Sequence, residues 1–375
     1  MSIATNMASR SSRWMRQATR VHAVGAAPIG AGGDPLSTMQ WHADHRHGAL
    51  MDALPFDVGG RWIIDWLDER DQVPGLVKIR DGASRGYDDI PYYAVADGHR
   101  LSRADLVLGR PQLTAAAFAV YDDVVGDDLP RRLQVSIPNA LDLAFFVAGS
   151  AEASAEWMPD LQSMVAAEVS EISARWGSRV VLQLESLAVL LAYDRTPRQD
   201  WALLTSELVQ QVAGILVAAP QAAWVLHLCY GDLAHEALIE PTDLTAAVQF
   251  LNGLDDFLVD LGLPMPTVHL PLAHGDNPPP TDPAFYTALR RLHRGIAVIA
   301  GLVAENHPQQ TRASVDLVVE ALGGLPDGIG AGCGHGRRSI AAGAANAALA
   351  AAITHALNTP ASCGKPRTET KPAQV

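Results

Sequence analysis

Short apolar runs alternate with longer amphipathic stretches along most of this 375-residue chain. The runs end at glycine, proline or polar residues, which is typical of buried strands. The longer stretches repeat apolar positions every three or four residues, as helices that cover a core do. Strands that are apolar on both faces and alternate with long helices indicate a parallel sheet covered by helices.

Eight of the runs are predicted to be strands, and the second is the least defined. It falls either near 56–58 or within 62–65. The other seven cover 20–25, 132–137, 179–184, 224–229, 267–272, 296–303 and 328–332. Helical patterns separate them, for example at 154–176, 200–217, 242–261, 283–293 and 311–322.

Eight strand–helix units in a chain of this length predict an α/β fold, the (β/α)8 TIM barrel. We expect one barrel domain, with catalytic function, over 20–358. The polar, basic segment 1–19 is expected to be a flexible N-terminal arm, and the Pro-, Lys- and Thr-rich segment 359–375 a disordered C-terminal tail.

Residues 86–109 do not fit a single strand–helix unit. We expect them to form a small insertion, with a hairpin around 92–95. The alternative to a barrel is a doubly wound open sheet, which needs a glycine-rich phosphate-binding turn and a helix after the first strand. That alternative ranks lower, because Pro28 lies where this helix should open.

Composition narrows the class of protein. The formal net charge is −13, which argues against nucleic acid as a partner. Three cysteines in a chain of this size do not indicate a disulfide framework, and no secretory signal is evident. The apolar run 339–357 contains Asn346 and His355 and is expected to be a helix packed on the sheet, not a membrane span. We therefore expect a cytoplasmic protein without a membrane partner, and self-association into a homo-oligomer stays open.

Polar residues with chemical potential lie at or just after the predicted strand ends. In a barrel, that end of the strands carries the active site. The residues are His22, Asn139, Glu185, His227, Cys229, Glu305, His307 and Cys333.

His227 and Cys229 are the strongest candidates, because side chains two apart on a strand point the same way. With Cys333 from the eighth strand they could bind zinc through three protein ligands. Three ligands and one open position define a catalytic zinc, which would make a bound thiol nucleophilic near neutral pH. The alternative is that both cysteines are small buried core residues.

Several motifs occur in the order found in one enzyme family. His227-Leu-Cys229-Tyr230, Gly332-Cys333-Gly334 and the later Arg337 resemble the catalytic domain of cobalamin-independent methionine synthase. The segments 21–28, 134–143 and 301–308 are similar to further motifs of that family, in the same order. The resemblance covers roughly 20–357 and implies a barrel in which the H-x-C and C-G motifs bind zinc. It also implies acid–base chemistry by the histidine of the 301–308 segment, His307, with Glu305 as its neighbour.

Three departures from that family limit what can be carried over. The family's glutamate ligand is missing from the strand at 267–272, where His269 or His274 could replace it. Of the family's D-E-P motif only Glu185 remains. The chain also has no room for a second barrel, so it resembles the short single-barrel relatives, which include the epoxyalkane:coenzyme M transferases.

The remaining residues each have two interpretations. Glu185 could bind the amino group of a thiol substrate or form an ion pair at the rim. His307 could be a general acid or simply cap the helix after Pro308. Arg337 could bind a carboxylate, sulfonate or phosphate or begin a solvated helix. His22 and Asn139 are expected to contact the substrate.

The leading hypothesis is a zinc-dependent transferase that moves a methyl or small alkyl group from a small-molecule donor onto a small-molecule thiol. One alternative is a lyase similar to uroporphyrinogen decarboxylase, which needs no metal but a cluster of arginines. Another is a relative that binds metal or thiol without turnover, which the missing glutamate would favour.

Overall fold

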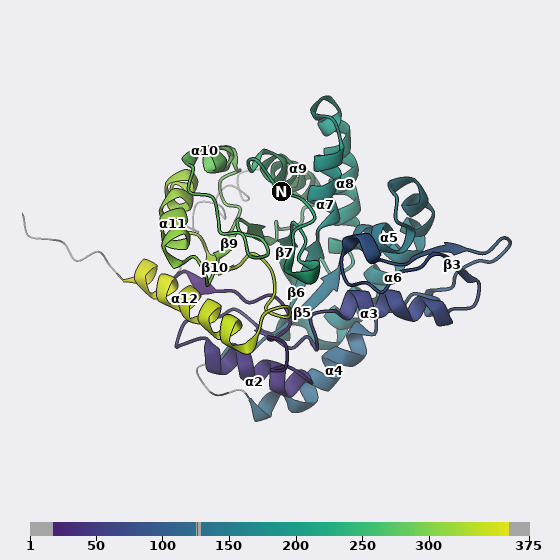
Figure 1. Cartoon of the computed structure of the whole chain (residues 1–375), viewed down its shortest axis with the longest axis horizontal. Helices are drawn as coiled ribbons and strands as arrows, with labels where there is room; N and C mark the ends of the chain where they lie inside the picture. The colour runs from purple at the N-terminus through teal and green to yellow at the C-terminus, as the bar shows by residue number, and fades with distance from the viewer. Residues whose placement is uncertain (1–17, 125, 127–128, 360–375) are drawn as a thin grey trace, which may run out of the picture.

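The protein folds as the predicted (β/α)8 barrel. The computed structural model describes residues 18–359, except 125 and 127–128. Eight parallel strands form one curled sheet, with the helices arranged around it (Figure 1). The strands are β1 Arg20–Val21, β2 Leu54–Pro55, β5 Leu133–Pro138, β6 Val180–Ser186, β7 Ala223–Leu228, β8 Thr267–Pro271, β9 Val298–Val303 and β10 Gly328–Ala331.

In this sheet β2 pairs with β5, and each strand from β5 to β9 pairs with the strand that follows it in the chain. The first strand, β1, pairs with β10. The strands β1 and β2 are therefore the two ends of the curled sheet. The Val21 N–H donates to the Leu50 carbonyl at 2.8 Å, which ties β1 to the segment that leads into β2.

The helices are α2 Pro35–His45, α3 Trp62–Asp68, α4 Arg110–Val120, α5 Ala140–Ala148, α6 Ala151–Trp176, α7 Ala188–Arg195, α8 Trp201–Leu216, α9 Thr245–Leu261, α10 Pro283–Tyr286, α11 Pro308–Leu322 and α12 Ile340–Asn358.

The second strand corrects one expectation. It is Leu54–Pro55, two residues long and just before the first of the two predicted positions, while the other position begins helix α3. Two residues are too few to show an apolar strand pattern. Proline is also uncommon inside sheets, because it cannot donate a backbone hydrogen bond to a neighbouring strand. The helix predicted at 283–293 is also shorter, because it becomes a 3₁₀ helix at Thr287–Arg291.

The insertion is larger than predicted. Its antiparallel hairpin pairs β4 (Tyr92–Val95), which matches the expected position, with β3 (Leu76–Arg80), which precedes it. The inserted segment therefore begins well before residue 86. The hairpin projects from one side of the barrel (Figure 1).

The barrel has two apolar layers. Residues on the outer face of the strands pack against the helices in one large core. A separate small cluster is formed by Ala53, which directly precedes β2, and by Val181, Val225 and Ile299 on β6, β7 and β9. Val225 points into the barrel in this cluster. His227 lies two residues after Val225 and so points into the barrel, one layer nearer the end where the strands finish.

Helix α12 alone, among the described helices, is long and apolar enough to cross a membrane by length and hydropathy. It packs against β10 and β1 like the other barrel helices. Its Asn346 is buried and donates to the Val303 carbonyl at 2.9 Å and to the Glu305 carboxylate at 2.7 Å. These contacts agree with the expected helix on the sheet.

The predicted ends of the barrel lie close to the limits of the described residues. Residues 1–17 and 360–375, and with them most of the predicted arm and tail, lie outside the described residues. Thr19, which was assigned to the arm, is buried and donates through its hydroxyl to the Pro326 carbonyl at 2.9 Å. Thr19 therefore packs with the barrel.

Candidate metal centre

Three neighbouring strands bring polar side chains into one row inside the barrel. Glu185 on β6 is in register with His227 on β7, and His227 is in register with His269 on β8. Partners in register on parallel strands point to the same face, so all three side chains enter the barrel. Cys229 follows His227 by two residues and lies just past the end of β7.

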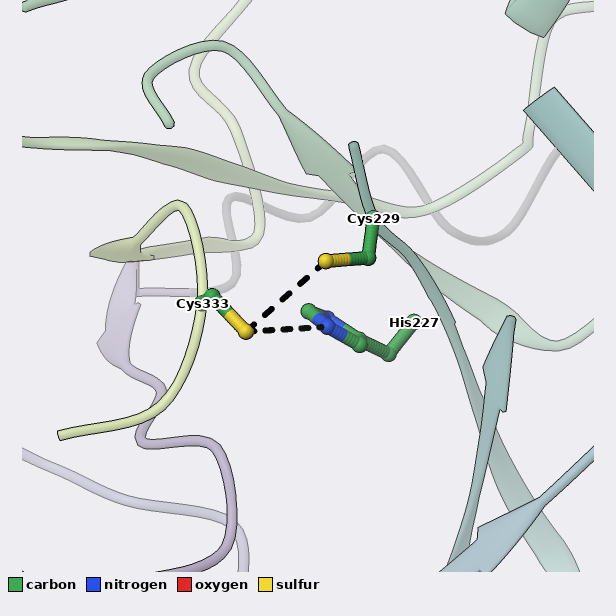
Figure 2. A group of neighbouring side chains, drawn as sticks. All are labelled: His227, Cys229 and Cys333. Carbon is green, nitrogen blue, oxygen red and sulfur yellow. Dashed lines mark hydrogen bonds between the residues drawn. The ribbon is translucent and has the colours of Figure 1, made fainter. Parts of the chain in front are cut away.

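Cys333 reaches the same place from the other side of the barrel. Figure 2 shows its sulfur pointing toward Cys229 and His227. The Cys333 Sγ lies 3.8 Å from the Cys229 Sγ and 4.0 Å from the His227 Nε2. All three ligand atoms are within 4.8 Å of one another. The sequence left open whether β7 and β10 could share a site, and the structure brings these residues together.

Gly332 explains how Cys333 comes so close. A Cβ at this position would lie 1.9 Å from the Ala273 carbonyl oxygen, in the loop that follows β8. The absence of a side chain therefore lets the β10 loop pack directly on the β8 loop, which directs Cys333 over the barrel mouth.

The spacing of the three ligand atoms fits a tetrahedral metal ion. Zinc bonds of about 2.3 Å to sulfur and about 2.0–2.1 Å to nitrogen place neighbouring ligand atoms roughly 3.6–3.8 Å apart. The observed 3.8 and 4.0 Å are close to this range. A disulfide, in contrast, requires sulfurs about 2.05 Å apart, and both cysteines are free thiols.

The tautomer of His227 follows from its neighbours. His269 Nε2 lies 2.9 Å from the Ala331 carbonyl oxygen, which can only accept, so this nitrogen carries the proton. In neutral His269 the Nδ1 is then an acceptor, and it lies 2.7 Å from His227 Nδ1. His227 Nδ1 must donate, which leaves the Nε2 lone pair of neutral His227 directed toward the cysteines.

Electrostatics favours a thiolate at Cys333. The hydrogen bond from the Cys229 thiol, together with the His227 imidazole, holds the pKa of Cys333 well below its usual range despite burial. The same bond, together with burial, raises the pKa of Cys229. Burial alone would lower the pKa of His227, but Cys333 and Glu185 outweigh it and raise that pKa.

A fourth protein ligand is not evident among the described residues. In the observed orientation, His269 uses both ring nitrogens for hydrogen bonds, to His227 and to Ala331. His274 lines a small pocket beside Cys333, but its Nδ1 faces the Asn277 amide at 3.4 Å. The three residues therefore leave one coordination position of a bound metal ion open, and this position would face that pocket.

Two predicted substrate contacts continue the polar network inside the barrel. Gln183 donates to the Glu185 carboxylate at 2.8 Å, and its amide oxygen lies 2.9 Å from the His22 Nε2. The His22 ring lies 5.3 Å from the ring of His269. Burial raises the pKa of Glu185 and lowers that of His22 to about 4. Both residues thus lie next to the candidate ligands.

Asn139 and Glu305 are engaged within the fold. Asn139 begins helix α5, and its amide bonds to Ser186 and Gln211. Glu305 accepts a bond from Arg338 at 2.8 Å and another from Asn346. Arg338, with the help of Asn346, holds the pKa of Glu305 below its usual range despite burial. These contacts hold both side chains within the fold, and the roles predicted for them in substrate binding and catalysis stay predictions.

His307 and Arg337 lie at the same end of the barrel. His307 precedes α11, as predicted, but its ring makes no capping bond and pairs with the Gln310 side chain at 2.8 Å. Arg337 Nη1 lies 3.7 Å from the Asp232 carboxylate. Among the described residues, no hydrogen bond or ion pair links His307 to the cysteines, so its predicted role stays a prediction.

Sequence reasoning missed Asp232 and its surroundings. Asp232 is buried, lines the pocket beside Cys333 and accepts a bond from His235 at 3.0 Å. The hydroxyl of Tyr87, from the insertion, accepts the backbone N–H of Asp232 at 2.9 Å and of Leu233 at 3.1 Å. In the sequence, Gly231-Asp232 indicates a solvent-exposed turn, and no local pattern predicts that the insertion covers it.

The fold and the cluster together define a barrel with a candidate metal centre at its C-terminal mouth. No protein-family model matches the chain, and no curated protein matches it in sequence. Among solved structures it is similar to a methyltransferase from Methanosarcina mazei, at 10% identity and a TM-score of 0.53. The match covers 94% of this chain and 98% of that one, so the two share the fold over their whole length.

Proposed function

We propose that this protein is a zinc-dependent transferase that moves a methyl or small alkyl group onto a thiol. The observation that carries the proposal is the convergence of one imidazole nitrogen and two sulfurs at the barrel mouth. Soft sulfur donors with one imidazole suit zinc. The similarity to a solved methyltransferase supports transfer of a methyl group.

His227, Cys229 and Cys333 would hold the metal, and His269 would orient His227. Zinc bound there would lower the pKa of an incoming thiol and make it a nucleophile near neutral pH. The protein contributes orientation and exclusion of water around the reacting sulfur. Glu185 and His22, which line the interior below the cluster, would contact the substrate.

Fewer contacts support the assignment of residues that would act on the methyl or alkyl donor. We assign His307 the acid–base role there, because it follows the C-terminal end of β9 and is partly exposed. Glu305 would act indirectly, by fixing Arg338. The lyase alternative finds little support among the described arginines, because Arg61 bonds to the Ser84 carbonyl and Arg338 to Glu305.

The test is metal analysis of protein purified under reducing, chelator-free conditions. We expect about one zinc per chain in the wild type and loss of zinc in Cys229→Ser and Cys333→Ser. The matched control is Cys363→Ser, because this cysteine lies outside the predicted barrel and should not affect zinc. A wild type with far less than one zinc per chain would contradict the proposal.

Turnover is tested separately with the cobalt-substituted protein. Adding a small thiol should change the sulfur-to-cobalt absorption, and methylated or alkylated thiol should form with a suitable donor. If the protein binds zinc but thiols do not change the sulfur-to-cobalt absorption of the cobalt form, the alternative of a protein that binds metal without turnover would be favoured. Binding of a tetrapyrrole by metal-free protein would favour the lyase.

A further inference from the structure

A buried carboxylate oxygen borders the pocket beside Cys333. Asp232 is 3% exposed, and its Oδ2 has no hydrogen-bond partner in the part of the chain that the structure describes. The charged group next to it is the Arg337 guanidinium, whose Nη1 lies 3.7 Å from this oxygen, beyond hydrogen-bond distance. A buried carboxylate oxygen without a hydrogen bond is costly in free energy. Asp232 and Cys333 line the same small pocket, so a ligand in that pocket could donate a proton or a hydrogen bond to this oxygen.

The other oxygen of Asp232 begins a path to the surface. Asp232 Oδ1 lies 3.0 Å from His235 Nδ1. On the far side of the ring, His235 Nε2 lies 3.2 Å from a carboxylate oxygen of Asp276, whose side chain is 77% exposed. One imidazole thus connects a buried carboxylate with one in solvent.

The backbone holds His235 in this position at a conformational cost. Ala234 and His235 have φ of 58° and 62°, a region that residues with a Cβ rarely adopt. Backbone strain of this kind persists only where the surroundings enforce it, and it clusters at functional sites. Here the Tyr87 hydroxyl accepts two N–H groups of the turn. Gly275 packs so closely that a Cβ would lie 2.4 Å from the His235 carbonyl oxygen.

The surrounding charges suit a proton acceptor at Asp232. Burial and the nearby Cys333 raise the pKa of Asp232, against the effects of His235 and Arg337. The bond to Asp232 raises the pKa of His235, against the effects of burial and Arg338. A carboxylate paired with an imidazolium can therefore take up a proton at one end and release one at the other without a change in its total charge.

We propose that Asp232, His235 and Asp276 form the route by which the proton of the thiol substrate leaves the site. This inference rests on the proposed function. The S–H bond of the thiol breaks, its electron pair stays on sulfur, and the proton bonds to Asp232 Oδ2. His235 releases the proton of its Nε2 to Asp276 and solvent, and keeps the Nδ1 proton that faces Asp232. One proton has then reached solvent and the thiol proton is held on Asp232. After the product leaves, Asp232 gives up this proton to solvent through the emptied pocket and His235 takes up a proton at Nε2, which restores the starting pair.

The experiment uses full-length cobalt-substituted protein mixed rapidly with 2-mercaptoethanol. The rate of the change in the sulfur-to-cobalt absorption and the release of protons to an indicator dye are both recorded. His235→Asn can keep a bond to Asp232 but cannot carry a proton, and we expect about a 10²-fold slower change. Imidazole in the buffer should restore much of the rate, which it would not do for a purely structural role.

Two further variants and one control complete the design. Asp232→Asn should be slow without rescue by imidazole, and Asp276→Asn should be slowed only slightly, because solvent can replace it. The control is His355→Asn, because this histidine lies on the exposed face of α12 and its Nε2 lies 3.1 Å from the His47 carbonyl oxygen. It should react like the wild type.

The outcomes separate the two proposals. If wild type responds to the thiol and His235→Asn responds equally fast, with no effect of imidazole, the proton route is wrong and the transferase proposal stands. If wild type binds no metal or never responds to thiols, both are wrong. Metal content of each variant shows whether it has folded with an intact site.

Discussion

His227 and His269 face each other through their Nδ1 atoms, 2.7 Å apart, on neighbouring strands β7 and β8. The bond from His269 Nε2 to the Ala331 carbonyl determines which of these two nitrogens donates. A carbonyl on β10 thereby determines, through two rings, that the lone pair of His227 points at the cysteines. Histidine ligands are commonly oriented by such a partner on the other ring nitrogen.

Replacing His269 should weaken metal binding without removing a ligand. In His269→Ala, His227 loses the acceptor for its Nδ1 proton and can rotate or change tautomer. Loss of such a partner typically costs about 10–100-fold in metal affinity. Competition with a chelator of known affinity measures the effect. His355→Ala is the control, because His355 lies on the exposed face of α12. Equal affinity of His269→Ala and wild type would rule out the positioning role.

Gly332→Ala should displace Cys333. The added Cβ would meet the Ala273 carbonyl oxygen at 1.9 Å, so the β10 loop has to move away from the β8 loop. We expect lower thermal stability and much weaker zinc binding, since metal sites tolerate only small displacements of their ligands. Gly324→Ala is the matched control, because a Cβ there meets no atom of the described residues within 4 Å. Unchanged zinc binding by Gly332→Ala would contradict this account of the loop.

Glu305→Gln tests whether Glu305 is structural. The substitution leaves Arg338 largely buried without its carboxylate partner, and breaking a buried pair typically costs about 3–5 kcal/mol. The pKa of Glu305 is lower in the folded state than in the unfolded state. Its stabilising effect is therefore present above the unfolded pKa and is lost as pH falls through the folded pKa.

Urea unfolding of wild type and Glu305→Gln at neutral and acidic pH measures both effects. The difference in the free energy of unfolding between the two proteins should shrink as the pH falls. A variant that is as stable as wild type but inactive would instead support the catalytic role predicted for Glu305.

The strands and the H-x-C pair were predictable because their signals are local. An apolar run that ends at a polar turn identifies β7, and alternation along a strand places His227 and Cys229 on one face. Strand β2 was misplaced, because two residues that include Pro55 carry too little pattern.

The completed site depends on contacts between segments far apart in the chain. Cys333 reaches Cys229 because Gly332 packs on Ala273, which no spacing rule predicts. Asp232 became a candidate because the β7 loop is covered by Tyr87 of the insertion. The sequence indicates which residues have suitable chemistry, but their distances depend on packing between loops.

The last prediction concerns acid stability. Burial lowers the pKa of His22 and His335 to about 4 and that of His42 to about 3. The unfolded chain binds protons at these histidines near pH 6.5, while the folded protein does not. The free energy of unfolding should therefore fall as pH drops from about 6.5 toward 4, by up to about 1.4 kcal/mol per pH unit for each histidine.

His42→Gln isolates one of these contributions. His42 Nε2 lies 3.2 Å from the Gly25 carbonyl, and a glutamine amide can donate a similar bond without titrating. Thermal unfolding of metal-free protein between pH 7 and 4 should give a shallower loss of stability for this variant than for wild type. His355→Gln is the control, because His355 lies on the exposed face of α12. Parallel pH profiles of His42→Gln and wild type would mean that His42 binds its proton equally well in the folded and the unfolded protein, which contradicts the prediction.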